Sequence, residues 1–228
     1  MTNAKIAEIF ESVQGEGKYA GLRQVFVRFF GCSLDCVWCD TRYAKDGGQW
    51  KEYTPLKLFK AVKRLSRYCH SVSLTGGEPL EQADFLYEFL PILKKNKFVT
   101  YLDTNGVQHK ELKRVIRDVD IVAMDIKLPS SAQCVPFWDE HARFLKIARQ
   151  KDVFIKMVLS DTLAWKDIRR AISIITSIAP ATPVFLQPHR WPLSQMQAQK
   201  YQEYQNYCSR HLDDVRIMPQ IHKILGFR

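Results

Sequence analysis

The feature that most constrains the fold of this chain is an alternation of short apolar runs with longer helical patterns. The apolar, β-branched runs are bounded by turn residues and cover 24–30, 71–75, 99–104, 121–128, 153–159 and 183–188, with a short seventh from 215. Helical patterns separate them, at 54–68, 83–96, 110–118, 137–150, 161–179 and 194–211. This alternation predicts right-handed βαβ crossovers and an α/β fold with a largely parallel sheet, either open or rolled towards a barrel.

Length and composition narrow the class of protein. The 228 residues predict one domain, 1–228, and no window approaches the roughly 18 apolar residues that a membrane span requires. The first residues lack the pattern of a secretory signal, so we expect a cytoplasmic protein. Thiols stay reduced there, and the six cysteines are therefore expected to be metal ligands, catalytic groups or small buried residues.

The charge is strongly basic, with 34 Lys and Arg against 24 Asp and Glu and a formal net charge of +10. Such a balance is typical of proteins that bind nucleic acid or an acidic small substrate. The basic residues are dispersed along helix-like stretches among acidic ones, and no RNA-binding signature is present. This dispersal favours solvated helix faces, and we expect no direct nucleic-acid contact.

The most specific motif is a C-x3-C-x2-C pattern formed by Cys32, Cys36 and Cys39, directly after the first apolar run. A structural zinc site needs four ligands, whereas the other cysteines lie far away in the sequence, at 69, 134 and 208. Three thiolates on a four-iron cluster leave one iron open for a substrate or cofactor. The pattern therefore favours an iron–sulfur cluster over zinc.

The motif and its surroundings resemble the radical S-adenosylmethionine (SAM) superfamily. An aromatic residue, Trp38, precedes the last cysteine, and "TGGEP" at 75–79 is similar to the superfamily's glycine-rich element, which binds the amino group of SAM through its backbone. Gly76 and Gly77 allow close backbone approach and unusual dihedral angles. The resemblance implies a partial β/α barrel of radical SAM type with about six mostly parallel core strands.

Within that superfamily the chain resembles the 7-carboxy-7-deazaguanine synthases. The resemblance spans nearly the whole chain, through "FESVQGEGKYAGLRQVFVRFFGCSLDCVWCDT", "TGGEP", "DTNG", "DIKLPSS", "LQP" and "MPQIHKILGFR". It implies contraction of 6-carboxy-5,6,7,8-tetrahydropterin to 7-carboxy-7-deazaguanine with loss of ammonia, in queuosine biosynthesis. It further implies a 4Fe-4S cluster, SAM and Mg²⁺ as cofactors, an electron donor such as flavodoxin or ferredoxin, and a homodimer.

The resemblance also implies a role for individual residues, while the radical chemistry is carried by the cofactor rather than by a catalytic side chain. Substrate binding is expected of Val13, Gln14, Gly15, Glu16, Arg28, Thr75, His222 and Arg228. SAM binding is expected of Trp38, Cys39, Asp40, Gly76, Gly77, Glu78, Asp125, Ile126, Lys127, Gln187 and Pro188. The cluster is expected on Cys32, Cys36 and Cys39, and Mg²⁺ on Thr41.

Three of these residues also have plain structural interpretations. Arg28 lies in an apolar strand, where a guanidinium is costly unless it has a partner, and strand alternation could instead turn it towards solvent. Glu16 fits a solvated loop charge, and Thr41 fits a helix cap or a turn hydroxyl.

Two other functions remain open from the sequence. An activase that abstracts hydrogen from a backbone glycine uses the same cysteine spacing, but its substrate is a large protein. A non-catalytic, basic nucleic-acid-binding module would use the net charge and keep the cysteine loop as structure only. The segments "VQGEG" and "QIHKILGFR" favour the small pterin substrate over both.

Overall fold

The computed structural model describes residues 2–227, and its strands form a single curved sheet in the order β3-β1-β2-β4-β5-β6-β7-β8-β9. Neighbouring strands from β2 to β9 are parallel, and β1 pairs antiparallel with both β2 and β3. The strands are β1 Ala4–Val13, β2 Arg23–Phe29, β3 Lys51–Tyr53, β4 Ser71–Gly76, β5 Thr100–Thr104, β6 Ile121–Asp125, β7 Asp152–Leu159, β8 Val184–Pro188 and β9 Val215–Ile217.

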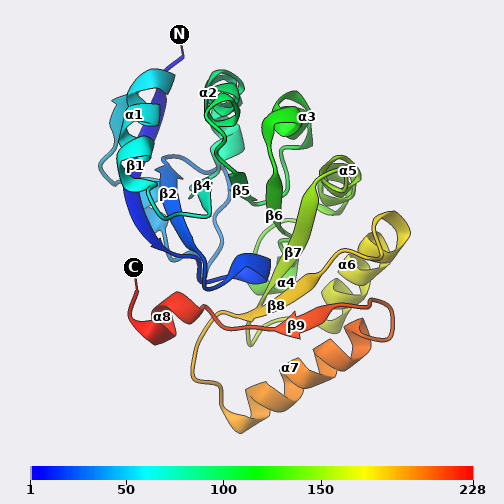
Figure 1. Cartoon of the computed structure of the whole chain (residues 1–228). Coiled ribbons are helices and arrows are strands. Elements are labelled where there is room, and N and C mark those ends of the chain that lie inside the picture. The colour runs from blue at the N-terminus through cyan, green and yellow to red at the C-terminus, as the bar shows by residue number, and fades with distance from the viewer. Residues whose placement is uncertain (1, 228) are drawn as a thin grey trace.

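The longer helices lie in an arc around the outside of the curved sheet, whereas α8 lies apart from this arc near the C-terminus (Figure 1). The helices are α1 Pro55–Leu65, α2 Ala83–Lys95, α3 His109–Val115, α4 Pro129–Ala132, α5 Trp138–Ala148, α6 Trp165–Ile178, α7 Gln195–Cys208 and α8 Ile221–Leu225. Short 3-10 turns cover Gly17–Tyr19, Arg42–Ala44, Pro79–Gln82 and Ile116–Asp118. The edge strands β3 and β9 do not pair with each other, so the barrel is open on one side.

Local sequence explains where the helices begin. The hydroxyl of Thr54 accepts a hydrogen bond from the Lys57 backbone N–H at the start of α1, where Pro55 takes the first position. At the start of α7, Ser194 and Gln197 form a reciprocal capping box. Within residues 2–227, no helix has both the length and the apolarity needed to cross a bilayer.

Two apolar layers pack on the two faces of the sheet. The larger one fills the space between the strands and the outer helices, with side chains such as Leu74, Phe85 and Ile155 fully buried. The smaller one lies inside the curve of the sheet and consists of Tyr101, Ile121, Ala123, Phe154 and Phe185. Because both faces of the central strands are covered, these strands read as continuous apolar runs in the sequence.

The structure confirms an open α/β barrel with a largely parallel sheet, and all seven predicted strands. Two strands were not predicted: β1, which carries charged residues along a half-buried surface, and β3, which is only three residues long and largely exposed. The run at 121–128 ends earlier than predicted, at Asp125. There the chain leaves the sheet, although the Ile126 backbone N–H still donates to the Lys156 carbonyl, 3.0 Å away.

Candidate active site at the carboxyl ends of the strands

A cavity of about 220 Å³ opens inside the curved sheet, at the carboxyl ends of the parallel strands. This is the edge at which ligands bind in open and barrel α/β folds. The residues predicted for the site that line the cavity are Val13, Gln14, Gly15, Glu16, Arg28, Cys32, Cys36, Trp38, Cys39, Asp40, Thr41, Thr75, Gly76, Gly77, Asp125, Lys127, Gln187 and His222.

Three of the predicted residues that the structure describes are not on this wall. Glu78 is fully buried behind it, and Ile126 belongs to the apolar layer under the helices. Pro188 lies instead beside a smaller adjoining hollow of about 120 Å³ with Trp191 and Ile224. Arg228 lies outside the described residues.

Strand alternation builds the floor of the cavity. Side chains two residues apart on a strand share a face, so each apolar side chain of the inner layer is followed by a polar one nearer the strand end. The pairs are Tyr101 and Asp103 on β5, Ala123 and Asp125 on β6, Phe154 and Lys156 on β7, and Phe185 and Gln187 on β8. The inner face therefore changes from an apolar plug to a polar floor within one alternation.

The cysteine loop, residues 32–41, forms one wall. Its Trp38 indole donates to the Ser131 carbonyl at 2.9 Å, and the Lys127 ammonium lies 4.8 Å from the centre of the Trp38 ring. All six cysteines of the chain are free thiols. Burial raises the pKa of Cys32 to about 11 and also raises the pKa of Cys36, so these thiols ionise only with a strong partner such as iron.

The donor set fits a 4Fe-4S cluster with one open iron. Cys32, Cys36 and Cys39 line the cavity, and among residues 2–227 no fourth cysteine does so. Cys134 packs in the same small apolar group as Cys36 but stays off the cavity wall. The three thiolates face a cavity whose other walls are polar. This arrangement suits a cluster whose fourth iron binds a further ligand in the cavity.

The glycine-rich element is shaped by the cysteine loop. Gly76 has a φ of +119°, which other residues adopt only with strain, and a Cβ on Gly77 would lie 1.9 Å from the Gly31 carbonyl oxygen. The Gly77 and Glu78 N–H groups donate to the carbonyls of Phe29 and Gly31, at 2.9 and 2.8 Å. Both glycines are therefore required by close packing between this turn and the chain leading to the cysteines.

Glu78 acts from behind the wall rather than at the cavity. Its carboxylate accepts hydrogen bonds from the Thr104 hydroxyl at 2.8 Å, the Asn105 N–H at 2.7 Å and the Leu80 N–H at 3.1 Å. Burial raises the pKa of Glu78 to about 7 despite these donors. The contacts join the ends of β4 and β5 and hold Asn105, whose buried side-chain N–H₂ lines the cavity without a partner. An unpaired buried donor fits a ligand that brings an oxygen acceptor.

Arg28 lines the cavity and has an internal partner. Its Nε donates to Glu8 Oε2 at 3.1 Å from the neighbouring strand β1, and Tyr43 donates to the same oxygen at 2.9 Å. The Arg28 side chain is 15% exposed, so the alternative that it points to solvent is wrong. The Nε bond leaves the two terminal nitrogens for further acceptors.

Lys127 and Asp125 form a buried ion pair at the end of β6, with Nζ and Oδ2 2.5 Å apart. Behind them His141 accepts the Lys127 N–H on Nε2 at 3.1 Å, and its Nδ1 lies 3.0 Å from the Gly106 carbonyl, to which it donates. Burial lowers the pKa of His141 to about 4. The neutral imidazole thus fixes the backbone that carries Lys127.

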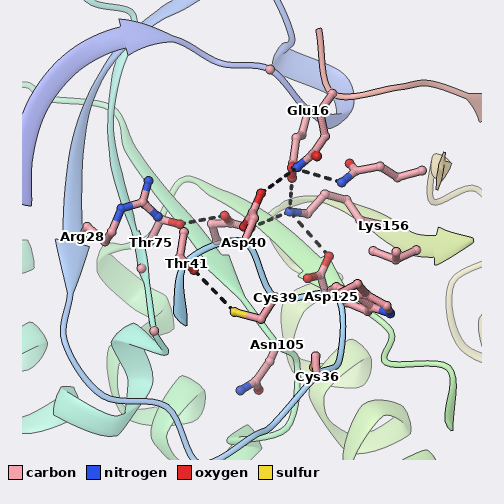
Figure 2. A pocket seen from close by; sticks show the side chains of 18 of the residues that line it. Glu16, Arg28, Cys36, Cys39, Asp40, Thr41, Thr75, Asn105, Asp125 and Lys156 are labelled. Atoms are coloured by element: carbon pink, nitrogen blue, oxygen red, sulfur yellow. Dashed lines mark hydrogen bonds and ion pairs between the residues drawn. The ribbon is translucent and has the colours of Figure 1, made fainter. Parts of the chain in front are cut away.

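The centre of the floor is Lys156, which contacts three carboxylates (Figure 2). Its Nζ lies 2.7 Å from Glu16 Oε2, 2.9 Å from Asp103 Oδ1 and 3.5 Å from Asp125 Oδ1. Glu16 Oε1 also accepts from the side chains of Gln187, at 3.1 Å, and Gln220. Glu16 is therefore not a solvated loop charge.

The C-terminal segment covers the open side of the barrel and meets the "VQGEG" loop. The Ile221 N–H donates to the Gly15 carbonyl at 3.0 Å, and Lys223 pairs with Asp40 at 2.8 Å. A Cβ on Gly15 would lie 1.7 Å from His222 Nδ1, so only glycine allows this approach. Burial lowers the pKa of His222.

Thr41 begins a 3-10 turn without capping it. Its backbone carbonyl accepts the Ala44 N–H at 2.8 Å, but its hydroxyl makes no capping hydrogen bond and lies 3.7 Å from Cys39 Sγ at the cavity wall. The helix-cap interpretation of this hydroxyl is wrong.

Several residues of the site were missed by the sequence analysis: Asp103, Asn105, His141, Lys156, Gln220 and Lys223. The signal for Lys156 was present, because a lone charge in the apolar run "VFIKMVL" raises the same question as Arg28 in "VFVRFF". "DTNG" likewise places Asp103 and Asn105 at a strand end.

Comparison with known proteins agrees with this geometry. A family model described as the radical SAM superfamily matches residues 26–175. The 7-carboxy-7-deazaguanine synthase of Geobacter sulfurreducens is 38% identical, over 98% of this chain and 97% of that protein. The crystal structure of QueE from Escherichia coli has the same fold, with a TM-score of 0.66 and 18% identity over 95% of this chain and 94% of that one.

A domain of the pyruvate-formate lyase-activating enzyme from Bacteroides vulgatus shares the fold less fully. It covers 64% of this chain and 98% of that domain, with a TM-score of 0.51 and 19% identity. The glycine-activase alternative is not favoured, because relatives that are 34% and 38% identical along nearly the whole of both sequences are 7-carboxy-7-deazaguanine synthases. Identity along almost the whole length of both sequences shows that this chain belongs to the 7-carboxy-7-deazaguanine synthase family of the radical SAM superfamily.

Proposed function

We propose that this chain converts 6-carboxy-5,6,7,8-tetrahydropterin to 7-carboxy-7-deazaguanine with release of ammonia, a step of queuosine and related 7-deazapurine biosynthesis. Family membership supports the reaction. The observation that carries the proposal is that one cavity joins the three-cysteine wall to a wall of groups suited to a carboxylated pterin, Arg28 and Glu16 among them.

Membership in the radical SAM superfamily implies a 4Fe-4S cluster and SAM as cofactors. Together they supply a 5′-deoxyadenosyl radical that removes a hydrogen atom from a substrate C–H bond. Cys32, Cys36 and Cys39 would hold the cluster. The Asn105 amide, with its unpaired donor, and Lys127 would bind SAM at the ends of β5 and β6.

On the substrate side, the free edge of the Arg28 guanidinium would bind the pterin carboxylate, a pairing that the planar guanidinium makes well. Glu16 would accept N–H bonds from the aminopyrimidinone ring, while the Gln14 side chain shapes the loop, because its Oε1 accepts the Glu16 N–H at 3.1 Å. His222 and the C-terminal segment would exclude water from the site.

Mg²⁺ would bind at Thr41 together with the substrate. A hydroxyl oxygen is a hard ligand of the type that Mg²⁺ prefers, and the Thr41 hydroxyl reaches the cavity wall without serving as a cap. One threonine is a weak anchor, so substrate oxygens and water would complete the coordination shell.

The remaining proposals concern the whole protein. A single radical SAM core domain over 1–228 is supported by the continuous sheet, and a cytoplasmic location by six free thiols. The sequence resemblance supports a homodimer and a one-electron donor such as flavodoxin or ferredoxin. His189 and Arg190 border the smaller hollow, and His189 also lines the main cavity.

The test is anaerobic reconstitution of the cluster, followed by incubation with the pterin, SAM and a reductant. Mass analysis should show a product lighter than the substrate by one NH₃, formed only when SAM is present. Unchanged pterin in a reaction that still cleaves SAM would reject the pterin as substrate.

A further inference from the structure

Lys156 is a buried cation to which the proposed reaction gives no task. It projects from the middle of β7 with 5% of its side chain exposed, between carboxylates from three separate segments. A buried ammonium is costly unless it is paired, and here the number of paired carboxylates exceeds what one charge requires. This arrangement calls for an explanation beyond packing.

Two of the carboxylates fix the ammonium from the sheet side. Asp103 on β5 lies 2.9 Å from Nζ and is itself held by the Thr75 hydroxyl at 2.8 Å, while Asp125 on β6 also pairs with Lys127. Asp125 comes from β6, which pairs with β7, and Asp103 comes from β5, the next strand beyond β6. The position of Nζ is therefore set by the fold.

The third carboxylate, that of Glu16, comes from a loop, and its position depends on its contact with the ammonium. Glu16 precedes the Gly17–Tyr19 turn and reaches the sheet only through its side chain, with Oε2 2.7 Å from Nζ. Its Oε1 accepts amide N–H groups from Gln187 and Gln220. Amide N–H groups are the kind of donor that an aminopyrimidinone edge presents, so the carboxylate is already arranged to accept such bonds.

We propose that Lys156 is a positioning residue for the substrate: its buried ammonium holds the Glu16 carboxylate in place and in its charged form, ready to accept N–H bonds from the pterin ring. The inference rests on the proposed function and adds a residue to it. A protonated carboxyl has lost one acceptor site and gained an O–H donor, which would face the N–H donors of the ring.

The electrostatics agree with the geometry. Burial alone raises the pKa of Glu16, but the charge and hydrogen bond of Lys156, with smaller help from Gln220 and His222, bring it down to about 2. The pKa of Lys156 is raised well above its usual value by its three carboxylates, although burial opposes this. The other titratable groups around the pair are Asp103 and Tyr101 of β5, Asp125 of β6, Lys127 just after β6, and His222 of α8.

The test is the pH dependence of pterin binding to the reconstituted enzyme without reductant, so that no turnover occurs. Equilibrium dialysis between pH 5.5 and pH 8.5 gives the Kd for wild type, Lys156→Met and Lys156→Arg. The ratio of each variant to wild type at each pH cancels the titration of the pterin itself. Lys18→Met is the matched control, since Lys18 pairs with Asp152 at the surface and off the cavity.

In Lys156→Met, the pKa of Glu16 should rise, because the lysine charge no longer opposes the effect of burial. The Kd of this variant for the pterin should then increase relative to wild type towards the acid end of the pH range, by about tenfold for each pH unit below the new pKa. The pH profiles of the Kd for Lys156→Arg and Lys18→Met should run parallel to that of wild type. In the double variant Lys156→Met/Glu16→Gln, the pH dependence of the Kd relative to wild type should vanish. This result would assign the titration to Glu16 rather than to Asp103 or Asp125.

A Lys156→Met profile parallel to wild type would overturn the proposal, as would a pH dependence that survives Glu16→Gln. If Lys156→Met does not fold, the protonation of Glu16 can be followed in the wild type by NMR of ¹³C-labelled glutamate. The Glu16 resonance is identified as the one that is missing in Glu16→Gln. It should keep the chemical shift of a carboxylate down to pH 5, and a change of its shift with pH above pH 5 would reject the proposal. Absence of pterin binding by wild type would instead reject the proposed function.

Discussion

The cysteine wall and the floor of the cavity are held in place by different forces. The cysteine loop, residues 32–41, is positioned by backbone contacts and a small apolar group that includes Leu34, Cys36 and Ala132, while its ion pairs, through Asp35 and Asp40, are exposed. The floor around Lys156 is positioned by buried ion pairs. The cysteine wall therefore depends mainly on shape and on its metal, and the floor depends on buried charge. A substitution on the floor should be mild only if it keeps both the charge and the geometry of the side chain.

The largest effect is expected on the cysteine wall. Cys36→Ser should abolish both cluster binding and pterin turnover, because no other cavity thiol can replace the lost ligand. Iron and sulfide content and the visible absorbance of the anaerobic protein measure the cluster. Cys69→Ser, Cys134→Ser and Cys208→Ser should keep it, and a requirement for any of these three equal to that for Cys36 would refute the open-iron site.

The next effect is expected at Arg28. Arg28→Lys keeps the charge but loses the planar fork, and turnover should fall by roughly 10- to 150-fold, as is typical for loss of a charge-assisted contact. The ratio kcat/KM for the pterin measures this, with cluster content unchanged. Arg23→Lys is the matched control, since Arg23 lies on the same strand but pairs with Glu11 at the surface. Equal kinetics for both variants and the wild type would remove Arg28 from the substrate site.

A smaller effect is expected at Thr41. Turnover by metal-depleted wild type should rise when Mg²⁺ is added, and Thr41→Ala should lose most of that response while keeping its cluster and SAM binding. Titrating Mg²⁺ into both proteins tests this, and Thr41→Ser, which keeps the hydroxyl, should respond like wild type. An unaltered response in Thr41→Ala would mean that the ion binds elsewhere.

The smallest effect is expected at His141, which supports the Lys127 backbone from behind the wall, and it concerns stability rather than turnover. Burial lowers the pKa of His141 to about 4 in the folded protein, whereas its pKa in the unfolded chain is about 6.5. Below pH 6.5 the unfolded chain therefore binds more protons than the folded protein. Its contribution to stability should be complete above that pH and decline by about 1.4 kcal/mol per pH unit towards pH 4. Urea unfolding of wild type and His141→Gln at pH 7.5 and 5.5 measures it. An equal loss in both proteins would assign the pH dependence to other groups.

Sequence patterns predicted the elements that lie between two packed layers. The apolar runs of β4 to β8 could be recognised because both their faces are covered, which leaves a continuous signal. β1 and β3 lie at one edge of the sheet with much of their surface exposed, so their patterns are weak. The end of β6 was missed because Ile126 and Leu128 are apolar and buried although the chain has already left the sheet.

Within the site, motifs predicted many of the residues that line the cavity but missed others, such as Asp103 and Lys156, which pair across 53 residues of sequence. The role of Glu78 could not be read from "TGGEP", since its contacts with Thr104 and Asn105 join segments 26 and 27 residues apart in sequence. Lys156 and Glu16 are 140 residues apart, and only the curvature of the sheet brings them together. A charge inside an apolar strand indicates that a partner exists, but the sequence does not name it.

The central claim is that one cavity presents the carboxylated carbon of a tetrahydropterin to the radical chemistry of the cysteine wall. The most direct measurement uses pterin carrying deuterium on that carbon, incubated with reduced wild-type enzyme and SAM. Mass spectrometry should then find deuterium in the adenosyl group of the recovered SAM or 5′-deoxyadenosine. Cleavage of SAM to 5′-deoxyadenosine that carries no deuterium, with the label retained on the pterin, would contradict the account.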